Sequence, residues 1–447
     1  MRATRAIPLA LFVAGCAVVA SPRPSSPRPS SPPSEPVTDL PTRQVTPISG
    51  PEVPTGQPAR PFEEVRALWV VRSTMTSAAE VTAMVEQADQ AGFNTVLVQV
   101  RGRADAFYSS SWEPRGETIT EADGFDPLAL TIDLAHARGI AVHAWVNTHL
   151  VWGGAGPAPR DSRHIVRAHP EWLAVPRALS VELFDVSPWD PIFVERLRKY
   201  AADNSGTVEG VYTSPSDARV KERVRSVWLD LASRYDLDGI HFDYIRFPSG
   251  DFDYSRGALE RFRRWVTPRL SPGLRAELAA AHAGDPLAYV DALSEPWAEF
   301  RRKHVTELVR WVYHGIKARR PELVVSAAVF SNQEDAFRNR YQDWPAWLEE
   351  GILDVAVPMA YTTDDDRFRA QIREGVAVAG KGRLWAGVGA YLNSHAGTLT
   401  KIDIAREEAT AGVVLFSYDW AVGDGYDGQG PTLLEVVGRT KFGGGRP

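Results

Sequence analysis

From residue 63 onward, short apolar runs rich in β-branched residues alternate with longer amphipathic segments. Eight such runs occupy residues 65–71, 94–101, 140–147, 237–245, 323–330, 352–361, 384–391 and 411–418. The segments between them, such as residues 78–92 and 217–235, have the apolar spacing of amphipathic helices. Near-continuous apolar strands that alternate with helices are typical of a parallel sheet covered by helices. Eight strand–helix units therefore predict an α/β fold, a (β/α)8 TIM barrel.

The uneven spacing of the strands predicts where the barrel carries insertions. About 90 residues separate the third strand from the fourth, and about 80 separate the fourth from the fifth. Loops at the catalytic end of a barrel build the substrate site, so we expect extended βα insertions after strands 3 and 4. An open doubly wound sheet is the structural alternative, but no glycine-rich nucleotide-binding turn follows the first strand. Residues 61–440 are predicted to form the barrel domain.

The first residues of the chain have the pattern of an export signal. Two arginines precede an apolar stretch that ends in Val-Ala-Gly-Cys and is too short to cross a bilayer. Residues 1–15 are therefore interpreted as a signal peptide. The sequence around Cys16, the only cysteine in the chain, resembles a bacterial lipobox, which predicts lipidation of this residue. The alternative is a soluble secreted protein whose cysteine lies there incidentally.

Residues 16–60 are rich in proline and serine and contain no aromatic side chain. Such a segment buries too little apolar surface to offset its ordering entropy, so it is predicted to be disordered. With lipidation at Cys16, it would form a tether between the lipid anchor and the barrel domain. The expected location is the cell envelope, with the exported chain held at a membrane through its N-terminal lipid anchor. Ala17, where an aspartate would favour inner-membrane retention, points to the outer membrane if the organism is Gram-negative.

The composition argues against two other classes of partner. A formal net charge of −6, without a basic stripe or a nucleic-acid motif, argues against binding to nucleic acid. The histidines are scattered, and neither an HExxH motif nor a Cys–His cluster is present, so no metal site and no cofactor is predicted. The sequence leaves the oligomeric state open.

Polar side chains gather where the predicted strands end, which is the catalytic end of a parallel barrel. The strongest candidate is Asp243, because aspartate is a poor strand former and is costly to bury unpaired. It can serve as nucleophile, general base or ion-pair partner, and the structural alternative is a buried salt bridge to Arg101 or Arg246. The side chains predicted to contact substrate or to support the acid are Arg101, Asp105, His143, Trp145, Asn147, Tyr244, Arg246 and Tyr361.

The expected contacts differ between these residues. His143 and Asn147 can form hydrogen bonds with hydroxyl groups, whereas Trp145 and Tyr361 can stack on sugar rings. Core packing is the alternative for Trp145. Tyr244 and Arg246 follow the acid closely and are expected to position it or to pair with it.

Glycoside hydrolysis usually needs a second carboxylic acid, ~5–5.5 Å from the first for retention or ~6.5–9.5 Å for inversion of configuration. Glu334 is predicted to be this acid because it follows the fifth strand, which neighbours the fourth. A solvated loop acid is the alternative for each such residue. Other acids that follow strand ends are Asp105, Asp335, Asp364, Asp365, Asp366 and Asp419.

Several motifs together resemble the glycosyl-hydrolase-like family 10. They are EVRALWVV, FNTVLVQVRGRADAFYSSSWEP, FDPLALTIDLAHARGIAVHAWVN, HPEWL and RYDLDGIHFDYIRFP. The resemblance implies a (β/α)8 barrel and hydrolysis of glycans in the bacterial cell envelope, in some members of peptidoglycan strands stripped of their stem peptides. By position, Asp243 matches the strand-four acid of the family. The VR…D motif matches Arg101 and Asp105, and the HAW.N motif matches His143, Trp145 and Asn147.

Two stretches depart from the family pattern. Many members have two consecutive acids before the tyrosine, where this chain has FDYIRFP with a single acid. The segment 180–217 is also longer and less typical than the corresponding part of the family.

Together, the motifs and the candidate acids predict an envelope glycoside hydrolase that acts on a polysaccharide, with Asp243 and Glu334 as its acids. A non-catalytic glycan-binding lipoprotein and a hydrolase of another bacterial polysaccharide are the alternatives.

Overall fold

The computed structural model describes residues 64–154, 156–423 and 430–443. The predicted signal peptide, Cys16 and the predicted tether lie outside these residues. Within the described ranges, no helix combines the length and the apolar character that a membrane span requires.

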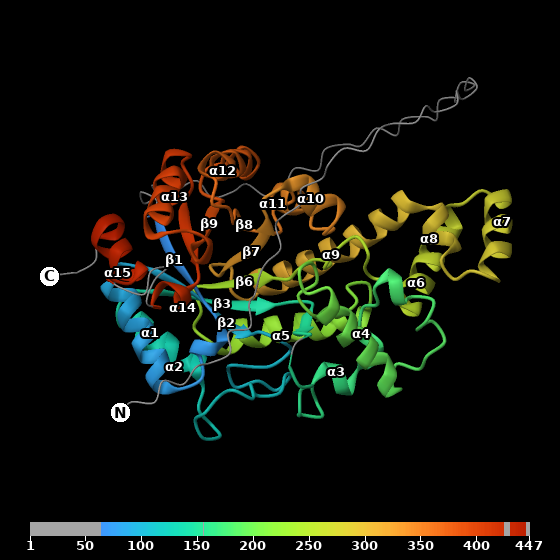
Figure 1. Ribbon diagram of the computed structural model, residues 1–447, viewed down its shortest axis with the longest axis horizontal. Coiled ribbons are helices and arrows are strands. Elements are labelled where there is room, and N and C mark those ends of the chain that lie inside the picture. Colours follow the sequence, from blue (N-terminus) through green and yellow to red (C-terminus); the bar gives the residue numbers. More distant parts are fainter. Residues whose placement is uncertain (1–63, 155, 424–429, 444–447) are drawn as a thin grey trace.

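Eight parallel strands close into a barrel, which confirms the predicted fold (Figure 1). In chain order they are β1 (Val65–Val70), β2 (Thr95–Arg101), β3 (Ala141–Asn147), β6 (Gly239–Asp243), β7 (Val324–Phe330), β8 (Val355–Met359), β9 (Trp385–Gly389) and β10 (Gly412–Phe416). Strand β10 pairs with β1 and closes the barrel, and β3 pairs with β6 across the first insertion. Helices cover the outer face, so the strands are buried on both sides.

The helices that cover the barrel begin at residues that cap them. The main ones are α1 (Ala78–Gln90), α2 (Pro127–His136), α5 (Ala218–Arg234), α9 (Ser294–Lys317), α12 (Asp365–Ala379) and α13 (His395–Glu407). Side chains of Ser77, Asp126 and Asp217 accept hydrogen bonds from backbone N–H groups in the first turns of α1, α2 and α5. Each cap satisfies a backbone donor that the helix itself leaves unpaired.

Side chains fill the inside of the barrel, so it is a packed core and not a pore. Trp69, Trp145 and Trp385 supply much of its apolar volume. The indole N–H of Trp69 donates to Nε2 of His241 across 3.1 Å, and the opposite ring nitrogen of His241 lies 2.9 Å from the hydroxyl of Ser326. The histidine is therefore satisfied as a neutral ring, and burial holds its pKa well below the usual value.

Both predicted insertions are present. The first follows β3 and contains the antiparallel pair β4 (Leu150–Trp152) and β5 (Val211–Tyr212), together with α3 (Ile165–Ala168) and α4 (Pro191–Asp203). Strand β5 approaches β4 so closely that a Cβ at Gly210 would lie 2.0 Å from the carbonyl oxygen of Trp152. Glycine at this position is therefore what allows the pair to form.

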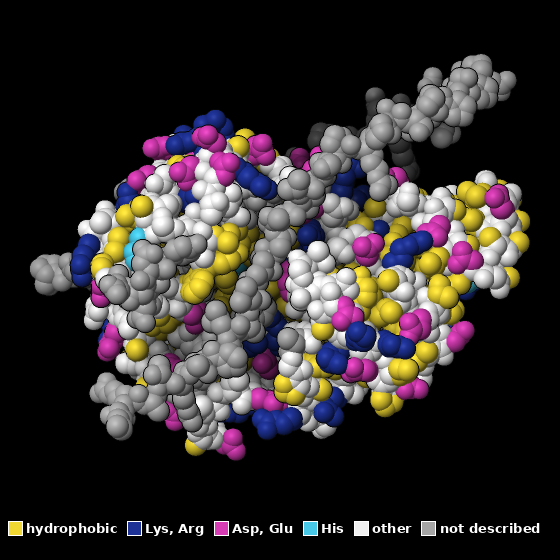
Figure 2. Space-filling view, in the orientation of Figure 1, with side chains coloured by type: hydrophobic (Ala, Val, Ile, Leu, Met, Phe, Trp, Pro, Cys, Tyr) yellow, Lys and Arg dark blue, Asp and Glu magenta, His cyan; other side chains and the backbone are white. Residues whose placement is uncertain are grey.

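The second insertion follows β6 and contains α6 (Arg256–Val266), α7 (Pro272–His282) and α8 (Ala288–Ala292). With the beginning of α9, these helices bury a small apolar core of their own that includes Phe262, Trp297 and Phe300. Figure 1 shows this part extending away from the barrel along α9, and Figure 2 shows hydrophobic and charged side chains interspersed over its visible face. The two insertions are joined, since the amide of Tyr254 donates to the carbonyl of Val175 across 2.7 Å.

Candidate active site

Asp243 is the last residue of β6 and is level with Asn147 of β3 in the strand register. The backbone turns sharply at this point, because Tyr244 has a φ of +50°. The turn lets the amide of Tyr244 donate to Oδ1 of Asp243 at 2.7 Å, while the indole of Trp145 donates to Oδ2 at 3.1 Å. The residue is 8% exposed. The carboxyl group is thus fixed by two donors at the C-terminal end of the barrel.

The surroundings of Asp243 favour its protonated form. Burial raises its pKa to about 6, against the opposing effects of the Arg246 charge and of the two hydrogen bonds. The negative charge of Glu209 adds to the increase. A carboxyl group with a pKa near the working pH can both give and take a proton, which is the property of a general acid or base.

Glu209 and Arg246 form an ion pair beside Asp243. Nη2 of Arg246 lies 2.8 Å from Oε1 of Glu209, and the hydroxyl of Tyr212 donates to Oε2 at 2.6 Å. The guanidinium group of Arg246 also lies over the ring of Tyr244, 4.7 Å from its centroid. Glu209 immediately precedes the Gly210–Tyr212 segment that contains β5, so the first insertion brings this acid to the end of the barrel.

Half-buried aromatic rings surround the ends of β8, β9 and β10. Tyr361 stacks on Phe416 with 5.7 Å between ring centroids, and Tyr391 meets Tyr361 edge-on at 5.9 Å. The pKa of Tyr361 is raised by burial and, to a smaller extent, by the charges of neighbouring groups that include Asp243. Rings of this kind offer an apolar face and a polar edge to a ligand.

Asp105 lies in the loop after β2, next to two arginines. Its Oδ1 accepts hydrogen bonds from the amides of Gly102 and Arg103, and its Oδ2 lies 3.9 Å from Nε of Arg72. Burial and the neighbouring Arg103 lower the pKa of Arg72 to about 10, and the charges of Asp105 and Tyr244 act in the opposite direction. This edge of the site thus carries two positive charges and one partly exposed carboxylate.

Arg101 and Asn147 do not occupy the positions expected of substrate contacts. Arg101 forms a fully enclosed ion pair with Glu113, with Nη2 3.1 Å from Oε1 and side-chain exposures of 2% and 0%. Asn147 donates to the carbonyl of Gly102 at 2.8 Å and is fully buried. Both side chains join the ends of β2 and β3. Asp243 consequently has no salt bridge to Arg101, and Arg246 pairs with Glu209 instead.

His143 and Trp145 also need correction as substrate contacts. His143 pairs in register with Gly239, four residues before the Asn147–Asp243 level, and it is buried inside the barrel. A Cβ on Gly239 would lie 2.3 Å from the His143 ring. Burial lowers the pKa of His143 to about 4, so the ring is neutral. Trp145 is equally enclosed and donates its indole N–H to Asp243, so it positions the acid.

Glu334 does not lie where the prediction requires. Strand β7 neighbours β6 as expected, but Glu334 belongs to the first turn of α10 (Gln333–Arg338) and faces solvent. Its side chain is 76% exposed and pairs with Arg338 at 2.9 Å on the same helix. Four residues beyond the strand end, the helix and not the barrel sets the direction of the side chain. The structure therefore does not bring Glu334 to Asp243.

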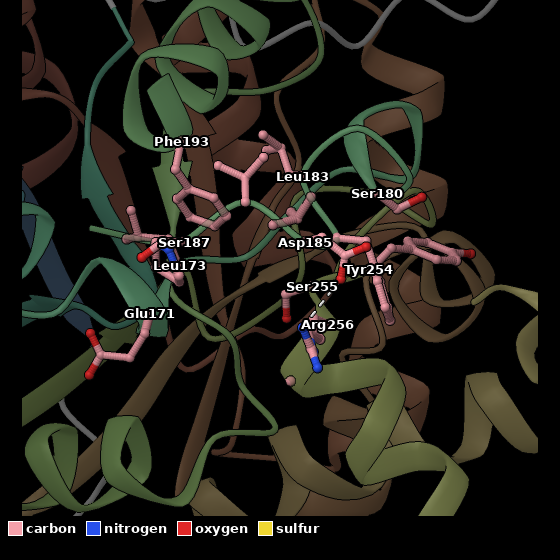
Figure 3. A pocket seen from close by; sticks show the side chains of 15 residues that line it. Glu171, Leu173, Ser180, Leu183, Asp185, Ser187, Phe193, Tyr254, Ser255 and Arg256 are labelled. Atoms are coloured by element: carbon pink, nitrogen blue, oxygen red, sulfur yellow. Dashed lines mark hydrogen bonds and ion pairs between the residues drawn. The ribbon is translucent and has the colours of Figure 1, made fainter. Parts of the chain in front are cut away.

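A pocket of about 220 Å³ lies between the two insertions (Figure 3). Leu183 and Phe193 lie on one side of it, and Ser255 and Arg256 lie on the other. None of the residues that line it is a strand-end candidate. Among the described residues, no group of three His, Cys, Asp or Glu side chains is placed to hold a metal ion.

The closed barrel with a buried acid at the end of its fourth strand, and with half-buried aromatic rings at the ends of β8, β9 and β10, is the architecture of a glycoside-hydrolase-type (β/α)8 protein. A comparison with protein families agrees and is more specific. Residues 64–382 match the family described as Glycosyl hydrolase-like 10, and the chain belongs to this family.

Curated relatives are distant. The chain is 25% identical over 366 residues to the glycosyl hydrolase DigH of Escherichia coli K12, a match that covers 72% of this chain and 70% of the relative. It is 23% identical over 344 residues to the glycosyl hydrolase YngK of Bacillus subtilis, covering 69% of this chain. The chain spans only 56% of the length of the Bacillus protein.

Solved structures support the fold. The glycoside hydrolase domain of PgaB (BpsB) from Bordetella bronchiseptica superposes with a TM-score of 0.56 at 13% identity, over 82% of this chain and 97% of that domain. The catalytic domain of β-amylase from Paenibacillus polymyxa gives a TM-score of 0.55 at 9% identity, over 87% and 100% of the two chains. At such identities the likeness concerns the fold alone.

Proposed function

We propose that this protein is a cell-envelope glycoside hydrolase in which Asp243 is the essential carboxylic acid. The family supports the reaction class, and the observation that carries the proposal is the buried carboxyl of Asp243 at the end of β6, whose pKa is raised to about 6, towards neutral pH. Glycosidic bonds break when an acid protonates the leaving oxygen. Trp145 and Tyr244 hold the carboxyl in place for this step.

The proposed substrate is the glycan strand of peptidoglycan without stem peptides. The resemblance of the sequence to its family supports this choice. Tyr361 and Tyr244 are half-buried next to Asp243 and can pack against sugar rings, and Asp105 can accept hydrogen bonds from sugar hydroxyls. A hydrolase of another bacterial polysaccharide and a non-catalytic glycan-binding protein are the competing functions.

The direct test is the cleavage of purified, peptide-free glycan strands, measured as the release of reducing ends. Asp243→Asn is expected to lower the rate by about 10²- to 10⁴-fold, the usual contribution of a general acid. Asp238→Asn is the matched control, because Asp238 precedes the same strand and instead accepts hydrogen bonds from the amide of Val142 and from His136. Wild-type protein that binds the strands without cleaving them is a binding protein. Cleavage only of a different polysaccharide would assign that substrate instead.

We further propose that the protein is exported and anchored through a lipid on Cys16. The lipobox-like sequence and the Pro/Ser-rich residues that follow it support this proposal. Several acyl chains on one cysteine bind a membrane firmly, at about 0.8 kcal/mol per buried methylene group. Expression in a bacterial host should place the wild type in the membrane fraction and Cys16→Ser in the soluble exported fraction. A wild type found in the soluble fraction would contradict the anchor.

A further inference from the structure

Glu209 is a carboxylate that the sequence did not single out, and the first insertion places it at the Asp243 site. Its side chain is 22% exposed, whereas Arg246, with which it pairs, is 4% exposed. The acid is therefore the outer and more accessible member of the pair. An ion pair that served only to fill the interior would not need an accessible carboxylate at the catalytic end of the barrel.

Two routes connect Glu209 with Asp243. Tyr212, whose hydroxyl donates to Glu209, meets the ring of Tyr244 edge-on with 6.0 Å between centroids. Arg246 lies over that same ring and lowers the pKa of Asp243, while Glu209 raises it. Glu209 thus pairs with Arg246, and the charges of both groups act on the pKa of Asp243.

The surroundings of the two acids shift their pKa values in opposite directions. Burial would raise the pKa of Glu209, but the charge of Arg246 and hydrogen bonds from Tyr212 and Arg246 outweigh it, so that the net change is downward. The pKa of Asp243, in contrast, is raised. Two acids whose surroundings separate their proton affinities in this way are the usual arrangement for one proton donor and one ionised partner.

We propose that Glu209 is the second catalytic carboxylate, the ionised partner of Asp243 in glycan hydrolysis. This inference rests on the proposed hydrolase function. Asp243 donates its proton to the glycosidic oxygen as the bond from that oxygen to the anomeric carbon breaks, and the bonding electron pair leaves with the oxygen. Glu209 removes a proton from the water whose oxygen forms the new bond to that carbon. Proton exchange with solvent then restores both acids, so one water is consumed.

One water is also consumed, and both acids are also restored, if a carboxylate oxygen of Glu209 attacks the anomeric carbon first. The glycosyl ester that forms is then hydrolysed by one water, with Asp243 as the base. In both routes Glu209 must be ionised, and the contacts with Arg246 and Tyr212 keep it so.

The test uses the full-length protein, peptide-free glycan strands and sodium azide. Glu209→Ala is expected to lower the release of reducing ends by about 10²- to 10⁴-fold. Azide should then restore turnover, because it attacks the anomeric carbon in place of the missing reactant, and mass spectrometry should detect a glycosyl azide. Glu182→Gln is the matched control: Glu182 forms an equally close Glu–Arg pair, 2.8 Å from Arg196, at an exposed position in the same insertion. It should keep the wild-type rate and form no azide product.

Removal of Glu209 leaves Arg246 buried without its partner, so folding is monitored by circular dichroism. If Glu209→Ala does not fold, Glu209→Gln and Glu209→Asp replace it. The glutamine variant should lose kcat with little change in KM, and the aspartate variant should recover part of kcat. A folded alanine or glutamine variant that keeps the wild-type rate, or an inactive alanine variant that azide does not rescue, overturns the role of Glu209. A wild type that does not cleave glycan at all refutes the hydrolase function itself.

Discussion

Trp145 donates its indole N–H to the carboxyl group of Asp243 across 3.1 Å, from the neighbouring strand of the same barrel. The hydrogen bond stabilises the ionised form of Asp243, and burial opposes it. The pKa of the acid is therefore set partly by a side chain that is itself enclosed in the barrel core.

Replacing Trp145 by phenylalanine should shift the pH profile of glycan cleavage. The ring remains, but the donor to the ionised carboxyl is lost, so the pKa of Asp243 should rise above about 6. A hydrogen bond to a charged group contributes about 1.5–3 kcal/mol, which corresponds to a shift of about one to two pH units. The alkaline limb of kcat/KM should move upward by that amount. An unchanged limb would show that Asp243 is not the group whose protonation limits the rate.

Asp243 should reduce the stability of the folded protein as the pH rises. Its pKa is about 6 when folded and 3.8 in its ordinary state, so the folded state favours the protonated form. That stabilisation is fully present below about pH 4 and is lost as the pH passes 6. The free energy of unfolding of Asp243→Asn minus that of the wild type should therefore increase by about 3 kcal/mol between pH 3.5 and pH 7.5. Urea denaturation at both pH values measures it, and a constant difference would contradict the raised pKa.

Breaking the buried pair of Arg101 and Glu113 should destabilise the protein strongly. Arg101→Met leaves the carboxylate of Glu113 enclosed without its partner, which costs about 3–5 kcal/mol. Arg160→Met is the matched control, because Arg160 forms a 2.8 Å pair with Glu117 but is 80% exposed. The control should change the free energy of unfolding by less than about 1 kcal/mol. Equal effects in chemical denaturation would refute a structural role for Arg101.

Gly239 and His143 should be energetically coupled. Gly239→Ala places a Cβ against the His143 ring and is expected to cost about 1–3 kcal/mol. His143→Ala removes that ring, so the double variant should be more stable than the sum of the two single effects predicts. The free energies of unfolding of the four proteins complete the cycle. Additive effects would mean that the two residues do not touch.

Gly210→Ala should disturb the site while leaving the barrel intact. The new Cβ would meet the carbonyl of Trp152 at 2.0 Å and separate β5 from β4, next to Glu209. A displacement of about 1 Å at a catalytic group can cost about 10²-fold in rate. Gly206→Ala lies in the same insertion with open space around it and should keep the wild-type rate. Similar rates for both variants would exclude an effect of β5 on catalysis.

The barrel and its insertions follow from the sequence because apolar periodicity and element spacing are local properties. The inward direction of His143, Trp145 and Asp243 also follows, since alternate residues of a strand share a face. The depth of each residue along the barrel axis does not follow from the sequence. His143 and Asn147 have the same parity, yet the register places His143 four residues below the level of Asp243, in the core.

Glu209, the proposed second acid, cannot be predicted from the sequence for a different reason. Glu209 precedes a strand of two residues, and so short a run has no periodicity that could identify it. The one available signal is Gly210, because a glycine in an extended stretch often marks a close approach of two backbones. The place of Glu334 after β7 predicts an acid at the site, but the direction of a side chain in a loop or in a first helical turn depends on tertiary contacts that the sequence does not reveal.

The strands β4 and β5 belong to the first insertion and lie outside the ladder that closes the barrel. The hydrogen-bonded ladder that closes the barrel therefore does not include this insertion. A chain that had closed its eight strands but not yet docked β5 would already be compact and helical, and it would lack the ion pair of Glu209 and Arg246. Substitutions along the insertion can thus impair the site while the eight-stranded barrel stays closed.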